Sequence, residues 1–72
     1  MRAEITQKNL YLILAGKVAA VASFIAEDEN ISPLDALSKF YESDTYRRLE
    51  QEDTKYWHYG PVALYQDYQL AL

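Results

Sequence analysis

The fold of this chain is decided by residues 5–28, ITQKNLYLILAGKVAAVASFIAED, which contain its longest apolar run. An α-helix has 3.6 residues per turn, so apolar side chains that recur every three or four residues line one of its faces. In this run the recurring side chains are Leu10, Leu14, Val18, Val21 and Ile25. The spacing predicts a long N-terminal helix that turns this stripe toward the core.

A second apolar set makes the apolar face of the predicted helix wider than that of an ordinary surface helix. Its members lie off the first stripe and are Tyr11, Ile13, Ala20 and Phe24. A helix that is apolar around much of its circumference is usually buried in a bundle or shared with a partner. Two interpretations stay open: a central helix wrapped by its own chain, and a helix packed partly against a second copy.

Lys17 stands in the middle of the apolar run and argues against a membrane-spanning helix. A lysine at the centre of a membrane costs about 3 kcal/mol on insertion scales. A secretory signal peptide is also disfavoured, because Glu4 spoils its basic start and Lys17 interrupts its apolar region. We therefore expect a cytoplasmic protein without membrane contact.

Length and composition predict one helical domain, residues 1–72, without a metal site or a cofactor. The chain contains no cysteine and one histidine, which excludes disulfides, thiolate metal sites and histidine-rich zinc sites. The core of so small a domain supplies only roughly 3–5 kcal/mol of net stability. Because half of the residues are hydrophobic (50%), we expect close helix packing, oligomerisation or both to stabilise the fold.

The net charge of −4 argues against a general nucleic-acid binder or a protein that binds anionic membranes, since both need a cationic face. Acids cluster in residues 27–29 and again in residues 50–53. Beyond Lys55 the only formally charged side chain is Asp67, and this last part is rich in tyrosine. Such a neutral segment favours packing or recognition over solvation.

Local capping signals divide the rest of the chain into further helices. We expect the first helix to begin near Thr6 and to end in the acidic run 27–30, where Asn30 tolerates a left-handed cap. Ser32 and Pro33 form the clearest start signal, with serine as the N-cap and proline at the first helical position. A second helix therefore begins there.

The second helix is expected to bury one apolar face, formed by Leu34, Leu37, Phe40 and Tyr41. Cap-type residues then predict a turn and a third helix over residues 44–52, although one longer helix through Ser43 is the alternative. Gly60 and Pro61 predict the start of a last helix, which runs to about residue 69. The sequence therefore predicts an all-α fold of four to five helices around the first.

Residues 31–60 contain a particular order of small, apolar, aromatic and cap-type side chains: Ser32, Pro33, Ala36, Leu37, Phe40, Tyr41, Ser43, Thr45, Tyr46, Leu49, Thr54, Trp57 and Gly60. This order resembles a group of small uncharacterised bacterial helical proteins, often encoded beside another short gene. The paired genes of that group imply a partner-binding role, like that of the neutralising half of a toxin and antitoxin pair. The resemblance covers less than half of the chain and carries over no functional residues.

The C-terminal aromatic side chains are the candidate binding site for another protein. They are Tyr56, Trp57, Tyr59, Tyr65 and Tyr68. Tyrosine and tryptophan bury much area while keeping a polar tip, so they anchor both the cores of small domains and protein interfaces. Core lining and a pocket for a small or aromatic ligand remain alternatives.

His58 is the residue through which acid or base catalysis near neutral pH would most simply run, with Asp53 or Glu52 orienting its ring. No nucleophile elbow, metal quartet or phosphate loop accompanies it, so we expect no catalytic residues. We predict a non-enzymatic protein-interaction module that forms a homodimer.

The alternative is a DNA-binding helix-turn-helix regulator, with Arg47 and Arg48 on its reading helix. Asp44 lies within four residues of both arginines, and Glu50 and Glu52 follow closely. We therefore expect the guanidinium groups to have internal partners, which disfavours nucleic-acid binding.

Overall fold

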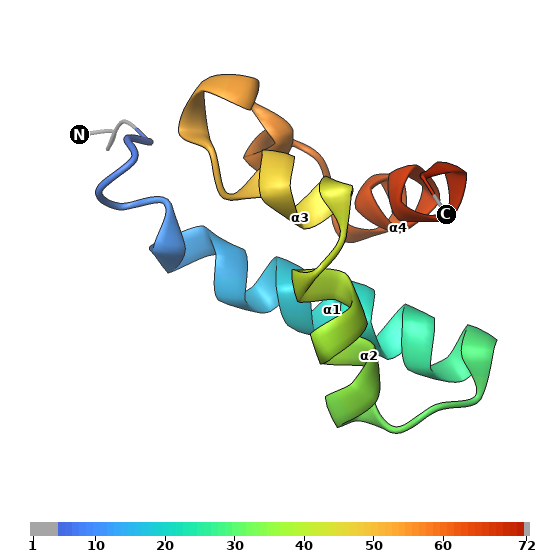
Figure 1. Cartoon of the computed structure of the whole chain (residues 1–72). Helices are drawn as coiled ribbons and strands as arrows, with labels where there is room; N and C mark the ends of the chain where they lie inside the picture. Colours follow the sequence, from blue (N-terminus) through green and yellow to red (C-terminus); the bar gives the residue numbers. More distant parts are fainter. Residues whose placement is uncertain (1–4, 72) are drawn as a thin grey trace.

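A computed structural model describes residues 5–71, whose regular elements are all helical (Figure 1). The elements are α1 (Tyr11–Glu29), α2 (Pro33–Tyr41), α3 (Asp44–Leu49), the 3₁₀ turns η1 (Glu52–Thr54) and η2 (Tyr56–His58), and α4 (Pro61–Leu70). The predicted all-α class is therefore confirmed. The first helix is the longest, at 19 residues, but it is shorter than the sequence predicts.

The N-terminal boundary of α1 differs from the prediction because the chain first makes a separate turn. The Thr6 amide donates to Asn9 Oδ1 at 2.7 Å, and the Asn9 amide donates to Thr6 Oγ1 at 3.4 Å. This reciprocal pair has the form of a capping box, and it caps the turn of residues 7–10. Thr6 is thus a cap, but the regular helix begins at Tyr11. At the other end Asn30 is left-handed, with φ 55°, as predicted.

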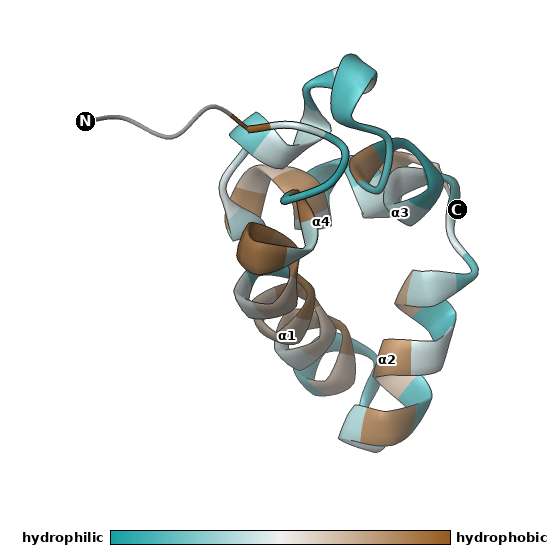
Figure 2. Cartoon of the chain, turned by 90° about the vertical axis from the view of Figure 1, so that its left-hand side faces the viewer, coloured by the Kyte–Doolittle hydropathy of each residue, from teal (hydrophilic) through white to brown (hydrophobic). Residues whose placement is uncertain are grey.

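The core lies where α1, α2, α3 and α4 face one another (Figure 2). Three members of the predicted stripe, Val18, Val21 and Ile25, are buried in this core, and Leu14 is half-buried against it. Leu10 is also buried, but it precedes α1 and lies outside this cluster. The buried cluster is completed by Ala22 of α1 and by residues from every other α-helix: Ala36, Phe40, Leu49, Leu64 and Tyr68. Helix α1 packs against α2 and α4, which makes it the central element of the fold.

Helix α2 turns inward only part of the face that the sequence predicts, since Phe40 is buried and Leu37 is half-buried against the core as expected. Its cap is as expected, since the Asp35 amide donates to Ser32 Oγ at 3.1 Å. The buried side chains are Ala36 and Phe40, however, whereas Leu34 is 73% exposed and Tyr41 is 48% exposed. The predicted burial of Leu34 and Tyr41 is therefore wrong. The prediction gave more weight to bulky residues. Helix α2 instead contacts its neighbours along the line of Ala36 and Phe40, which lie four positions apart on one face.

Ser43 separates α2 from α3, so the alternative of one longer helix is wrong. Its hydroxyl donates to the Phe40 carbonyl at 2.6 Å and accepts from the Tyr46 amide at 3.1 Å. Helix α3 ends at Leu49, not at Glu52 as predicted, because the next residues leave helical geometry. Gln51 is extended, with φ −100° and ψ 115°.

Hydrogen bonds of two side chains, Gln7 and Asp67, connect α3 and the short elements that follow it to the rest of the fold. The Gln7 amide group donates to the Glu50 carbonyl at 2.9 Å and accepts from the Glu52 amide at 2.8 Å. The Asp67 carboxylate of α4 accepts from the buried Thr45 hydroxyl at 2.7 Å and from the Tyr56 hydroxyl at 3.4 Å. Asp67 thereby joins α3, η2 and α4.

Candidate protein-interaction surfaces

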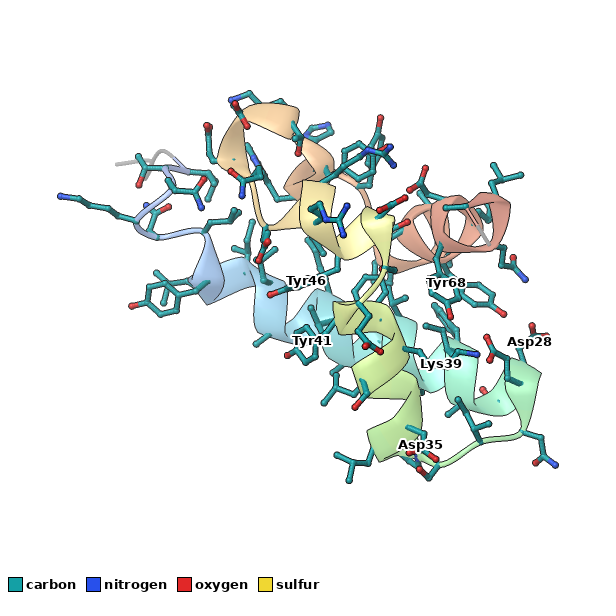
Figure 3. All side chains as sticks on the ribbon, viewed as in Figure 1. Asp28, Asp35, Lys39, Tyr41, Tyr46 and Tyr68 are labelled. Atoms are coloured by element: carbon teal, nitrogen blue, oxygen red, sulfur yellow. The ribbon has the colours of Figure 1, made fainter. Side chains whose placement is uncertain are left out.

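The five predicted partner-binding aromatics fall into two separate groups. Tyr56, Trp57 and Tyr59 belong to the segment around η2, which is orange in Figure 1, whereas Tyr65 and Tyr68 belong to α4. In Figure 3 Tyr68 lies beside Lys39 and toward Asp28, near the C-terminal end of α1. The structure therefore does not bring the five side chains into one patch.

The first group forms a partly exposed surface in which rings alternate with cations. Tyr59 is 49% exposed and packs edge to face on Tyr56, with ring centroids 5.4 Å apart. The Trp57 indole is half-buried, and Nε1 donates to a backbone carbonyl at 2.9 Å. The Lys55 ammonium lies 5.8 Å from the Trp57 centroid, and the Arg48 guanidinium lies 5.9 Å from that of Tyr56. Amphipathic rings held in this way are typical anchors of protein interfaces.

Tyr68 belongs to the core, because its side chain is only 2% exposed. Its ring packs edge to face on Phe40 at 6.1 Å, and its hydroxyl donates to Glu29 Oε2 at 3.4 Å. Burial, followed by the nearby Glu29 carboxylate, raises the pKa of Tyr68. The inclusion of Tyr68 in the exposed binding set is therefore corrected: a partner could reach this ring only if the core opened.

Tyr65 is half-buried and forms the wall of a shallow hollow between α1 and α4. The hollow measures about 360 Å³ and is lined by Phe24, Glu27, Asp28 and Tyr65. The Tyr65 ring lies 5.6 Å from that of Phe24 and stacks on Tyr68 at 6.4 Å with an interplanar angle of 16°. A hydrogen bond to Asp28 raises the pKa of the Tyr65 hydroxyl to about 12.

A second hollow lies between the α2–α3 turn and the end of α4. It measures about 310 Å³ and is lined by Lys39, Glu42, Ser43, Asp44, Tyr68 and Ala71. Two of its charged groups already have partners, since Lys39 pairs with Glu29 and Asp44 pairs with Arg47 at 3.0 Å. Hydrogen bonding to Glu29 raises the pKa of Lys39. The charges of this hollow are thus largely used within the fold.

The outer side of α1 faces away from the core and carries no charged residue from Leu12 to Ser23. We define it by its exposed residues: Leu12, Ala15, Gly16, Ala19 and Ser23. Leu12 is 67% exposed, and the neighbouring Tyr11 is 68% exposed. In the second apolar set predicted from the sequence, Tyr11 is therefore exposed, whereas Ile13, Ala20 and Phe24 are half-buried.

Sequence reasoning missed both the outer side of α1 and the Tyr65 hollow, although each has a signal in the sequence. A glycine inside a helical pattern, here Gly16, is less favourable than alanine by about 1 kcal/mol and therefore stands out in the sequence. Phe24 is followed at i+3 and i+4 by Glu27 and Asp28, which places the ring and both acids on neighbouring positions of one helix. Only the tertiary structure shows that Tyr65 of α4 completes the lining of this hollow.

His58 is exposed, and its ring packs against Trp57 with centroids 6.1 Å apart. Of the two acids predicted to orient it, Glu52 pairs with Lys55 at 2.7 Å, and neither makes a hydrogen bond to the imidazole. Within residues 5–71, no group of three or more His, Cys, Asp or Glu side chains is placed to hold a metal ion.

The arrangement of α2 and α3 gives little support to a helix-turn-helix DNA reader. Helix α3 has six residues, so it offers less than two turns to a groove. Arg47 pairs with Asp44, as the charge pattern predicts, and Arg48 lies over the Tyr56 ring. The DNA-binding alternative stays a prediction, which a duplex affinity that falls steeply with salt would support.

No helix in the described part of the chain is both long enough and apolar enough to span a membrane.

Comparisons with protein-family models, with curated proteins and with solved structures gave no match. The resemblance to small bacterial helical proteins therefore stays a prediction.

Proposed function

We propose that this protein is a non-enzymatic protein-interaction module that forms a homodimer through the outer side of α1. Tyr56, Trp57 and Tyr59 are its recognition surface for another protein. The single observation that carries the proposal is an exposed helix side that extends from Leu12 to Ser23 and carries no charged residue.

The water-facing side of a helix in a soluble domain is normally charged or polar. Between Lys8 and Glu27 the only charged residue is Lys17, and Lys17 does not make the outer side of α1 polar. Its ammonium donates to the Tyr59 carbonyl at 2.7 Å, on the side of α1 that meets the η2 segment. The outer side is left with leucine, alanine, glycine and serine, which suits contact with another apolar surface.

Gly16 gives this side a second unusual property. A glycine in the middle of a helix is less favourable than alanine by about 1 kcal/mol. The backbone at Gly16 does not have positive φ, and a Cβ atom added there would meet no atom within 4 Å. The isolated fold therefore gives no packing reason for glycine. A second helix that approaches closely would give one, because the separation of packed helices depends on the side chains at their contact.

A second copy of this chain is the occupant that the charges favour. In a two-fold symmetric dimer the same patch meets itself, so like charges on it would repel. The chain carries a net charge of −4, and the outer side of α1 is where two copies can meet without adding to that repulsion. A cytoplasmic, antitoxin-like role, in which the dimer presents its aromatic surface to a second small protein, extends the same proposal.

Light scattering on the purified full chain tests the dimer. We expect the mass of two chains at high micromolar concentration, and the mass of one chain for Ala19→Glu, which places like charges at the centre of the contact. Ala63→Glu is the matched control, because Ala63 is exposed on α4 and the substitution is the same. A wild-type chain that stays monomeric throughout the concentration series contradicts the proposal.

The recognition surface is tested by affinity capture from the native cell with two matched tyrosine variants. Tyr59 is 49% exposed in the proposed surface, and Tyr41 is 48% exposed outside it. We expect a captured protein to be lost with Tyr59→Ala and kept with Tyr41→Ala. Equal loss with both variants would exclude the η2 segment as the specific surface.

A further inference from the structure

We propose that the hollow between the last turn of α1 and α4 binds a cationic side chain, arginine or lysine, of a protein partner. The hollow is the one lined by Phe24, Glu27, Asp28 and Tyr65. This inference rests on the proposed function in one respect, namely that the partner is a protein, and it adds the chemistry by which that partner is recognised.

The aromatic wall of the hollow is held in a fixed orientation. The Phe24 and Tyr65 rings lie 5.6 Å apart and are inclined by 49°. Tyr65 also stacks on Tyr68, which is buried in the core, and its hydroxyl accepts from Gln69 Nε2 at 3.3 Å. A cation placed against such a ring is attracted by the negative charge of the ring face, and a partly desolvated contact is worth about 1 kcal/mol or more.

The carboxylates of the hollow have no cationic partner within the described residues. Glu27 and Asp28 lie in the last turn of α1, where the helix dipole is negative and disfavours acids. No basic residue lies in that turn, and the nearby Lys39 pairs with Glu29 instead. Asp28 interacts with the neutral Tyr65 hydroxyl, and that interaction raises the pKa of Tyr65 to about 12. A cation in the hollow would offset both the acid charges and the helix dipole.

The shape of the hollow indicates a side chain on a larger surface as the ligand. Pockets for free small molecules usually enclose most of the ligand surface. This hollow is shallow and opens to solvent, although its volume of about 360 Å³ accommodates a guanidinium or ammonium group with part of its stem. The rest of the binding energy would then come from neighbouring contacts of the partner protein. The second hollow is less suited, because Lys39 lies in its lining.

The test is a titration of the isotope-labelled full chain, followed by amide NMR shifts at low ionic strength. The probe is N-acetylarginine methylamide, and its neutral isostere N-acetylcitrulline methylamide is the control ligand. We expect saturable shifts concentrated in residues 24–28 and around Tyr65, with a dissociation constant on the order of millimolar. The citrulline control should bind at least about fivefold more weakly, because it lacks the charge.

Two variants with conservative charge removal complete the experiment. Glu27→Gln with Asp28→Asn should abolish the saturable shifts. Asp53→Asn, which removes an exposed acid of η1, should leave the affinity within about twofold of wild type. Shifts spread over all acidic segments, equal binding of the citrulline probe, or an equal loss with Asp53→Asn would each overturn the proposal. Because light scattering measures self-association separately, failure here is distinguishable from failure of the proposed homodimer.

Discussion

The C-terminal half of α1 and the N-terminal end of the described chain are held in place by different interactions. The C-terminal half buries Val21 and Ile25 completely against side chains of α2 and α4, such as Phe40. The N-terminal end buries one large side chain, Leu10, and is otherwise held by polar bonds at the surface, above all the two bonds from Gln7 to backbone groups near η1. Tyr11 and Leu12 stay exposed there.

This contrast indicates which part of the small domain contributes most to its stability and which part exposes apolar surface. Burial of apolar area is the dominant stabilising term, at about 25 cal/mol per Å². An exposed hydrogen bond contributes only about 1 kcal/mol, because water competes for both groups. The C-terminal half should therefore form the cooperative core, while the N-terminal end opens more readily and leaves apolar side chains for a partner.

The largest expected effect comes from removing the ring at the centre of the well-packed half. Phe40→Ala should cost roughly 3–5 kcal/mol, which is comparable to the whole stability of a domain of this size. Urea unfolding followed by circular dichroism measures the loss. Leu34→Ala in the same helix removes an exposed side chain and should change the free energy of unfolding by less than about 0.5 kcal/mol. Similar losses for the two variants would contradict the assigned inner face of α2.

A smaller and more local effect is expected at the N-terminal end. Gln7→Ala removes both bonds to the backbone of residues 50–52 and should cost about 1 kcal/mol. Amide hydrogen exchange should become faster at Glu52, whose amide loses its acceptor, but not at Ile25 in the core of α1. Slowed or unchanged exchange at Glu52 would show that Gln7 does not hold this segment.

Gly16→Ala should strengthen the fold while weakening the proposed dimer. In the isolated chain the added methyl group meets open space and favours the helix, so we expect a gain of about 0.5–1 kcal/mol at concentrations where the protein is monomeric. In the dimer the methyl group would separate the two helices. Thermal unfolding and light scattering on the same samples measure both effects. A gain in both stability and dimer affinity would argue against close contact at Gly16.

The smallest effect is a pH dependence that belongs to the C-terminal half. The pKa of Tyr65 is raised to about 12, first by its hydrogen bond to Asp28 and then by burial. The pKa of an unfolded tyrosine is about 10. Since the folded state holds this proton more tightly, its contribution to stability is complete below about pH 10 and is lost as the pH rises toward 12.

Tyr65→Phe should therefore reduce the fall in stability across that pH window, as measured by urea unfolding at several alkaline pH values. The fall should not vanish, because the pKa values of Tyr68, Tyr46 and Lys39 are also raised and act in the same direction. An unchanged slope for Tyr65→Phe would mean that the Asp28 bond is not maintained in solution.

The local features of this protein follow from its amino-acid order alone. Ser32, Ser43, Asn30 and the Gly60–Pro61 pair act on backbone groups within a few residues, so their chemistry can be read without knowing the fold. The buried stripe of α1 was also predictable, because helical periodicity alone aligns it. These signals gave the all-α class and most helix boundaries, but not which side of α2 faces the core.

The tertiary structure alone decided the features that depend on distant segments. Tyr68 became a core residue and Tyr65 a surface wall, although both are tyrosines of one helix. Tyr68 packs on the buried Phe40 of α2, whereas Tyr65 packs on the half-buried Phe24 of α1. The Gln7 side chain forms hydrogen bonds with backbone groups more than forty positions away, at Glu50 and Glu52. No local pattern encodes such pairings, since packing of whole helices fixes which side chains meet.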